Sequence, residues 1–238
     1  MSSEREPETT PRQYVNYAFF QVDPAWRRLP EAERKAGKDE FARIVNDYRG
    51  RALVVPFSTM GTRGDCDFML WRIAYDLELF QEMNARLLAT GLGQWLSRPY
   101  SFLGQAKTSV YEDEFIHPSQ EEKRSRVRPG EYKYLFVYPF VKTREWFLLP
   151  KEERQKIMGG HIKVGHEYPS IKLNTIYCFG MDDQEWVVAF ESNRPSDFVD
   201  IVMDLRETES SKYTLRDTPI FTCLRGDSIS AVLDTLGG

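Results

Sequence analysis

The chain of 238 residues carries 32 Lys and Arg against 36 Asp and Glu, a net charge of −4 with a pI near 5.6. This balance gives no reason to expect nucleic acid as a partner. No apolar run reaches the ~18 residues of a membrane span, and the polar start lacks the apolar core of a secretory signal. Cys66, Cys178 and Cys223 show no CxxC spacing, so we expect no disulfide framework and a cytoplasmic location.

Apolar periodicity predicts the helices and strands in chain order. Residues 1–12 are polar and contain proline, and we expect a disordered tail there. In the first half we expect a strand at 16–22, a helix at 30–48, strands at 52–58 and 66–74, a helix at 77–88 and a strand at 97–107. Residues 112–130 are a polar, charged linker. In the second half we expect a strand at 132–140, a helix at 150–168, strands at 171–179 and 186–191, a helix at 195–208 and a strand at 218–224.

The order β-α-β-β-α-β therefore occurs twice, and the sequence itself indicates a duplication, with chance similarity as the alternative. WRRLPEAER, which begins at Trp26, matches WFLLPKEER, which begins at Trp146, at an offset of 120 residues. Each half has the pattern of a ferredoxin-like unit, whose sheet has one face that helices leave uncovered. We therefore predict an α+β fold in which two such units, residues 13–111 and 131–238, pack sheet to sheet as a β-barrel with helices outside.

The helix of the second half differs from its first-half counterpart at His161, which the offset aligns with Phe41. The position that holds a core-facing aromatic side chain in the first half thus holds an imidazole in the second half. The other residues of the two faces are apolar or aromatic apart from one glycine: Ile157, Val164 and Tyr168 in the second half, and Gly37, Ile44 and Tyr48 in the first.

Three glycines, Gly159, Gly160 and Gly165, surround His161. Each costs a helix interior roughly 1 kcal/mol relative to Ala, which suggests that a bulky, flat group approaches the backbone closely. An iron porphyrin bound by a neutral imidazole fits both features, because histidine is a common haem ligand. A core histidine bonded to a backbone carbonyl is the alternative, and it is the commoner role for a lone His. His166 is rotated roughly 140° from His161, so the two cannot chelate one ion from one face.

The strand before this helix offers further candidates. Lys142 follows it directly, and a cation beside an apolar pocket suits a carboxylate tail, although such cations are also common on ordinary surfaces. Aromatic side chains alternate along YKYLFVYPF and share one face of the strand, a pattern most often found in a core: Tyr132, Tyr134, Phe136 and Tyr138.

Taken in order, these motifs resemble the chlorite dismutase superfamily and, within it, the coproheme decarboxylase branch. The resemblance rests on YPFVKTREWFLLPKEER, the His in MGGHIKVGHEYP, LNTIYCFGMDDQEWVVAFE and VMDLRETESSKYTLRDTPIFTCLRG. It covers the second half well and the first half weakly. It implies a double ferredoxin-like barrel, a homopentamer, and a haem-type iron porphyrin in the C-terminal half.

The resemblance also implies roles for single residues. His161 falls on the proximal haem ligand, Tyr138 on the tyrosine that takes part in oxidative decarboxylation, and Lys142 on a lysine next to the propionates. Trp146 falls on a tryptophan near the cofactor, and His117 looks like a distal histidine that serves as a base for peroxide.

Chlorite dismutases proper carry a distal Arg on the strand after the ligand helix. Here the position holds Asn174, or Leu173 if the alignment slips by one residue. A neutral side chain cannot hold a hypochlorite fragment by charge, so chlorite dismutation is not expected. Asn174 also differs from the Gln of another decarboxylase branch, and His166 stands where an Arg is frequent.

The function implied is peroxide-dependent decarboxylation of coproheme III to haem b, the last step of a haem-synthesis route. Two alternatives remain open: a haem-binding or haem-sensing protein with weak peroxidase activity, and an interaction module without haem. Tyr138 together with Lys142 favours the enzyme over the haem binder. The linker at 112–130 is expected to be mobile and to act as a gate over the cavity.

Overall fold

The computed structural model describes residues 11–111 and 126–237. The first half contains β1 (Tyr14–Val22), α1 (Glu31–Asp47), β2 (Leu53–Ser58), β3 (Phe68–Ala74), α2 (Glu78–Leu88) and β4 (Leu96–Gln105). The second half contains β5 (Tyr134–Lys142), α5 (Lys151–His166), β6 (Ile171–Tyr177), β7 (Trp186–Ser192), α6 (Pro195–Glu207), β8 (Thr214–Arg216) and β9 (Phe221–Arg225). Each helix and strand predicted from periodicity is present, with ends that differ by a few residues.

Short elements were not predicted, because a segment of three to six residues shows too little of a period to be recognised. They are the 3-10 helices η1 (Pro24–Arg28), η2 (Gly93–Trp95) and η4 (Glu209–Tyr213), the helices α4 (Arg144–Leu148) and α7 (Ile229–Asp234), and strand β8. None of the described helices is long and apolar enough to cross a membrane.

The strands form one antiparallel sheet in the order β7-β6-β4-β1-β3-β2-β9-β5-β8. Because β5 also pairs with β7, the pairings return to the strand from which they started. The two halves meet through short pairings only, Gln105 with Tyr177 on one side and residues 57–58 with 224–225 on the other. Within each half, the strands follow the same relative order, β4-β1-β3-β2 and β9-β5-β7-β6.

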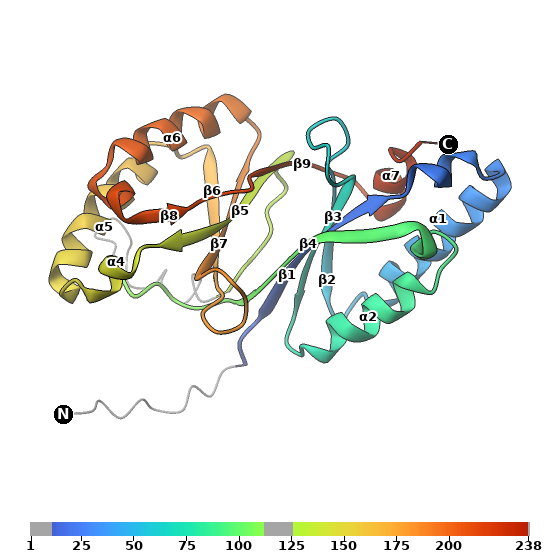
Figure 1. Ribbon diagram of the computed structural model, residues 1–238, viewed down its shortest axis with the longest axis horizontal. Helices are drawn as coiled ribbons and strands as arrows, with labels where there is room; N and C mark the ends of the chain where they lie inside the picture. Colours follow the sequence, from blue (N-terminus) through green and yellow to red (C-terminus); the bar gives the residue numbers. More distant parts are fainter. Residues whose placement is uncertain (1–10, 112–125, 238) are drawn as a thin grey trace.

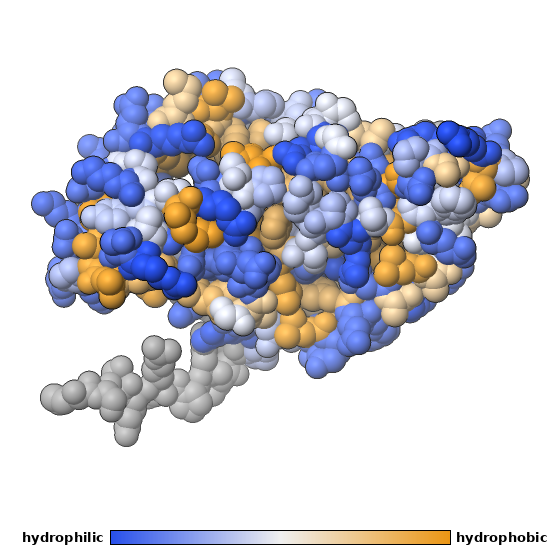
Figure 2. Space-filling view, in the orientation of Figure 1, coloured by the Kyte–Doolittle hydropathy of each residue, from blue (hydrophilic) through white to orange (hydrophobic). Residues whose placement is uncertain are grey.

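Helices lie outside the sheet at its two ends (Figure 1). Helices α1, α2 and α7 cover the first half, and α4, α5 and α6 cover the second. The predicted α+β class is thereby confirmed, with a large antiparallel sheet, whereas the packing of two units as a β-barrel stays a prediction. The division into two ferredoxin-like units at residues 13–111 and 131–238 stays a prediction. The face shown in Figure 2 is mostly hydrophilic, with small separate hydrophobic areas.

Buried side chains form three clusters, of which the one under α5 and α6 is the smallest. Under α1, Phe41 is fully buried and packs edge to face against Phe20 and Phe68. A second cluster fills the space between the two halves, with Tyr17 and Trp71 stacked at 5.4 Å between ring centroids. The first half is therefore closely packed beneath its helices, whereas the second half leaves space beneath α5.

Candidate functional site

A cavity of about 750 Å³ is lined by residues of α5, α6 and strands β5, β6 and β7. The strand register places Tyr138, Val188 and Thr175 in one row across β5, β7 and β6, and all three line the cavity. His161 lines it from α5. The structure thus brings Tyr138 and His161 to the same cavity, although 23 positions separate them in the sequence.

His161 is half-buried, and its Nδ1 atom lies 3.4 Å from Ser210 Oγ in η4. Burial, followed by the charge of Lys142, lowers the pKa of the imidazole to about 4. The ring is therefore neutral at physiological pH. With Nδ1 held by Ser210, Nε2 is the nitrogen left to bind an iron.

Lys142, at the end of β5, is 5% exposed and lines the same cavity. Its Nζ donates to the carbonyl oxygen of Ser210 at 2.5 Å and to Ser210 Oγ at 3.2 Å. The ammonium also lies 4.8 Å from the ring centroid of Trp146, which is 1% exposed. Burial lowers the pKa of Lys142 to about 8. Contact between Lys142 and a propionate stays a prediction, as does the role of Trp146 beside the cofactor.

Tyr138 is 8% exposed and stacks on Phe190 with 6.2 Å between ring centroids. Burial raises the pKa of its hydroxyl well above the usual value of 10, so the phenol keeps its proton. Phe136 lies on the same face, as predicted. Tyr132 does not share this face, because β5 begins only at Tyr134.

Asn174 and Leu173 both line the cavity, but from opposite faces of β6. Leu173 pairs with Phe190, shares the face of Tyr138 and is 53% exposed. Asn174 is buried and donates from Nδ2 to Glu191 Oε1 at 2.8 Å. Both residues are neutral, so the predicted distal position carries no cation whichever of the two occupies it; the distal role itself stays a prediction.

Sequence reasoning missed Glu191, a carboxylate in β7 that is 1% exposed. It accepts hydrogen bonds from Asn174 and from the backbone N–H of Gly130, and it forms an ion pair with Lys172 at 3.4 Å. An acidic residue at the end of the apolar run WVVAFE was the available signal. Glu191 ties the end of the predicted linker to the sheet.

The rest of the predicted linker, residues 112–125, lies outside the described residues, and so does His117. The described end is anchored, because the backbone N–H of Val127 donates to Gln13 Oε1 at 2.7 Å and its side chain is buried. The gate role and the base role of His117 stay predictions.

The charge of the cavity is one-sided. Among the described residues that line it there is no Asp or Glu. Basic residues from several segments do line it: Lys107, Arg126, Arg128, Lys142 and Lys172. Because the chain as a whole has a net charge of −4, this concentration of cations is local. Aromatic and aliphatic side chains supply most of the remaining lining, so the cavity suits a ligand with an apolar body and several negative groups.

The glycines of α5 do not serve helix packing in the described structure. A Cβ atom added at Gly159, Gly160 or Gly165 would meet nothing within 4 Å. Of the three, Gly165 lines the cavity, as does its neighbour His166. The backbone of α5 at Gly165 is thus open toward the cavity, whereas Gly159 and Gly160 do not line it; the close approach of a flat group to this backbone stays a prediction.

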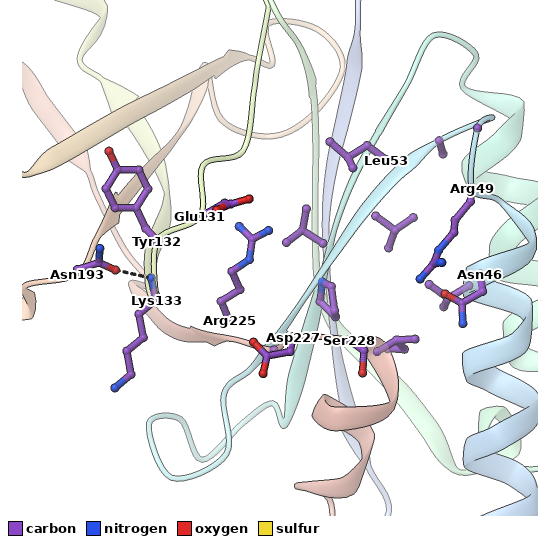
Figure 3. Close-up of a pocket in the computed structure, with 18 residues that line it drawn as sticks. Asn46, Arg49, Leu53, Glu131, Tyr132, Lys133, Asn193, Arg225, Asp227 and Ser228 are labelled. Carbon is purple, nitrogen blue, oxygen red and sulfur yellow. Dashed lines mark hydrogen bonds between the residues drawn. The ribbon is translucent and has the colours of Figure 1, made fainter.

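A second cavity of about 700 Å³ lies where β2 and the segment before β5 separate (Figure 3). Its lining mixes charges of both signs: Arg225 lies near Glu131 and Asp227, and Arg49 lies on the opposite side of the cavity. Tyr132 is found here. Of the predicted site residues that the structure describes, none lines this second cavity.

Comparison with known proteins decides the family. The sequence model described as chlorite dismutase matches residues 34–226. The chain belongs to the chlorite dismutase family. Among relatives, it is 31% identical over 218 residues to a coproheme decarboxylase of Mycolicibacterium smegmatis, with 88% of each chain covered. It is 24% identical to a chlorite dismutase of Ideonella dechloratans, covering 87% of this chain and 74% of the relative.

Solved structures share the fold over almost the whole chain. A variant of the chlorite dismutase of Candidatus Nitrospira defluvii gives a TM-score of 0.85 at 25% identity, with 94% of each chain covered. A haem-binding protein of Thermus thermophilus gives a TM-score of 0.83 at 25% identity, with coverage of 94% and 95%. The predicted superfamily is thereby confirmed.

The low pKa of His161 predicts a pH-dependent stability. Between the folded pKa of about 4 and the usual value of about 6.5, only the unfolded chain protonates this imidazole. The free energy of unfolding should therefore fall as the pH drops through this window. His161→Phe, which installs the residue found at Phe41, should make that fall shallower. Urea unfolding of ligand-free protein at several pH values measures it.

Met158→Leu provides the control, because Met158 lies on the same helix and lines the same cavity but does not titrate. This variant should keep the wild-type slope. If His161→Phe leaves the pH dependence of the free energy of unfolding unchanged, His161 is protonated equally in the folded and unfolded states.

Proposed function

We propose that the chain catalyses the peroxide-dependent oxidative decarboxylation of coproheme III to haem b. The observation that carries the proposal is the cavity lined by Lys and Arg and, among the described residues, by no Asp or Glu. Coproheme presents a flat apolar ring with four propionates, which complements such a lining. The 31% identity to a coproheme decarboxylase supports the same reaction.

The residues of the cavity fit an iron porphyrin. His161 offers a neutral imidazole whose Nδ1 is held by Ser210, and a second contact of this kind orients many metal-binding histidines. When bound, the iron supplies the redox chemistry with hydrogen peroxide. Gly165 leaves the backbone of α5 open on the cavity side. His161 is therefore the proposed ligand.

Tyr138 is the proposed relay between peroxide and propionate. Two of the four propionates react, one after the other, and each of these loses carbon dioxide, two electrons and a proton to become a vinyl group, with one hydrogen peroxide used for each. Hydrogen peroxide takes up these electrons, that proton and one from solvent, giving two waters. Because burial keeps the phenol of Tyr138 protonated, its oxygen carries a hydrogen atom that it can give up and regain from the propionate. Two of the three N–H donors of Lys142 go to Ser210, which leaves one for a carboxylate.

A haem-binding protein with weak peroxidase activity is the second candidate. The similarity to the haem-binding protein of Thermus thermophilus favours it. The two candidates differ in whether Tyr138 acts chemically or only packs against Phe190. The family resemblance alone supports a homopentamer in the cytoplasm, with His117 as a base for peroxide.

Replacing Tyr138 by Phe separates the two candidates. Tyr138→Phe should bind coproheme normally, because its ring packing is kept, but should decarboxylate it on the order of 100-fold more slowly. Mass spectrometry of coproheme before and after addition of peroxide measures this. Tyr134→Phe removes a hydroxyl from the same face of the same strand and should react at the wild-type rate. His161→Ala should lose the Soret band.

Wild-type turnover by Tyr138→Phe would remove the tyrosine from the mechanism. The haem-binding candidate, or an enzyme with another radical site, would then take precedence. Product formation by His161→Ala at the wild-type rate would remove His161 as the ligand.

Chlorite should not be converted to oxygen. Neither Asn174 nor Leu173 can hold a negatively charged fragment over the iron by charge. An oxygen electrode with haem-loaded protein and chlorite should record negligible release. Fast, sustained oxygen evolution would show that another cation, such as a Lys or Arg of the cavity rim, replaces the missing Arg.

Alanine substitutions at Gly165 and Gly160 test whether the porphyrin lies close to the backbone of α5. An Ala at either position should stabilise the ligand-free helix by up to about 1 kcal/mol, because neither Cβ meets a neighbour. Only Gly165→Ala places its methyl group at the cavity, so it alone should weaken haem binding in a Soret titration. Equal haem affinity in the two variants would mean that the porphyrin stays away from the backbone of α5.

A further inference from the structure

Three residues from different segments form a chain of polar contacts at His161. Lys142 Nζ donates to the carbonyl oxygen of Ser210 at 2.5 Å and to its Oγ at 3.2 Å. Ser210 Oγ in turn lies 3.4 Å from His161 Nδ1. Lys142 is 5% exposed and Ser210 is 3% exposed, so bulk water screens this ammonium from the imidazole only weakly.

The local fold builds this arrangement. Ser210 lies in η4, and the chain then enters β8, which pairs with the end of β5 beside Lys142. The backbone N–H of Thr143 donates to the carbonyl of Tyr213 at 2.8 Å, which fixes η4 against β5. The rings of Trp146 and Phe140 lie 4.8 Å and 5.3 Å from the ammonium, closing it in.

The hydrogen-bonding capacity of Ser210 limits what His161 can do. A hydroxyl has one donor and two acceptor sites, and an ammonium only donates, so Lys142 occupies one acceptor site. An imidazole bound to iron through Nε2 carries its proton on Nδ1. That proton then goes to the remaining acceptor site of Ser210 Oγ.

The acceptor of this proton is therefore a neutral hydroxyl already bonded to a cation. Within the described residues, no Asp or Glu forms an ion pair with Lys142 or a hydrogen bond with His161. A carboxylate at this place would draw the Nδ1 proton toward itself and make the imidazole a stronger electron donor. A hydroxyl held by an ammonium acts in the opposite direction.

We propose that Ser210 and Lys142 are positioning residues that hold His161 as a weakly donating ligand and raise the Fe(III)/Fe(II) reduction potential of the bound porphyrin. The inference rests on the proposed function only in taking His161 as the iron ligand. A nearby positive charge favours the ferrous state, which carries one positive charge less. Weaker donation from the imidazole shifts the potential in the same direction.

The experiment uses the full chain loaded with haem b, without peroxide, so that its readouts do not depend on turnover. They are the reduction potential and the iron–histidine stretching frequency of the ferrous protein in resonance Raman spectra. Lys142→Met removes the charge and keeps a chain of similar length, and it should lower the potential. Ser210→Asp places a carboxylate at Nδ1, and it should lower the potential and raise the stretching frequency.

Two further variants separate this role from a merely structural one. Ser211→Asp adds the same charge one residue away on η4, where Ser211 is half-buried, and it should leave the stretching frequency unchanged, because that frequency reports the contact of Ser210 with Nδ1. Ser210→Thr keeps the hydroxyl and should stay near the wild-type potential. Because Lys142→Met and Ser210→Asp act through different residues, one of them suffices if the other fails to bind haem.

The inference is overturned if both variants bind haem b and keep the wild-type potential and stretching frequency. If the Soret band of the protein with haem b does not depend on His161, the inference and the proposed function are both overturned. A protein that shows the predicted shifts but leaves coproheme intact with peroxide would overturn the proposed function alone.

Discussion

Strand β5 is paired on both sides, with β7 and with β9, and this double pairing fixes the direction of each of its side chains. Leu135 and Val137 point into the fully buried core between the halves. Tyr138 and Lys142 point the other way, into the cavity beneath α5. A slip of one residue would exchange the two sets, so the site exists only in this register. The burial of Leu135 and Val137 in the core between the halves thereby keeps Tyr138 and Lys142 directed toward the cavity.

Periodicity was sufficient for the long elements, and the repeat at Trp26 and Trp146 anticipated the matching strand order of the two halves. The repeat also exposed His161, because its counterpart Phe41 shows what a purely structural residue looks like at this position. Ser210 stayed hidden, since its helical turn is too short to show a period. Its contacts join residues far apart in the sequence, which only the tertiary structure brings together. For Asn174 and Leu173 the sequence left the register uncertain by one residue, and one residue decides the face.

Composition was a poor guide to the charge of the site. A net charge of −4 is a sum over the whole chain, whereas the described residues that line the cavity include Lys and Arg but no Asp or Glu. Burying the ammonium of Lys142 costs free energy, which the oxygens of Ser210 and the ring of Trp146 offset. A buried ammonium does not by itself increase the stability of the fold. Buried cations with a shifted pKa that line a cavity are typical of functional sites, here one suited to an anion.

The space beneath α5 also links the abundance of the protein to its ligand. The first half is closed by aromatic packing around Phe41, whereas the second half has a cavity of about 750 Å³ where that packing would be. A ligand that fills the cavity binds only the folded chain, and at a concentration of 1,000 times its Kd it adds about 4 kcal/mol to the stability. The ligand-free chain opens more often and is exposed to proteases in proportion. The level of the protein in a cell should then follow the supply of the ligand that fills this cavity, without any change in the synthesis of the protein.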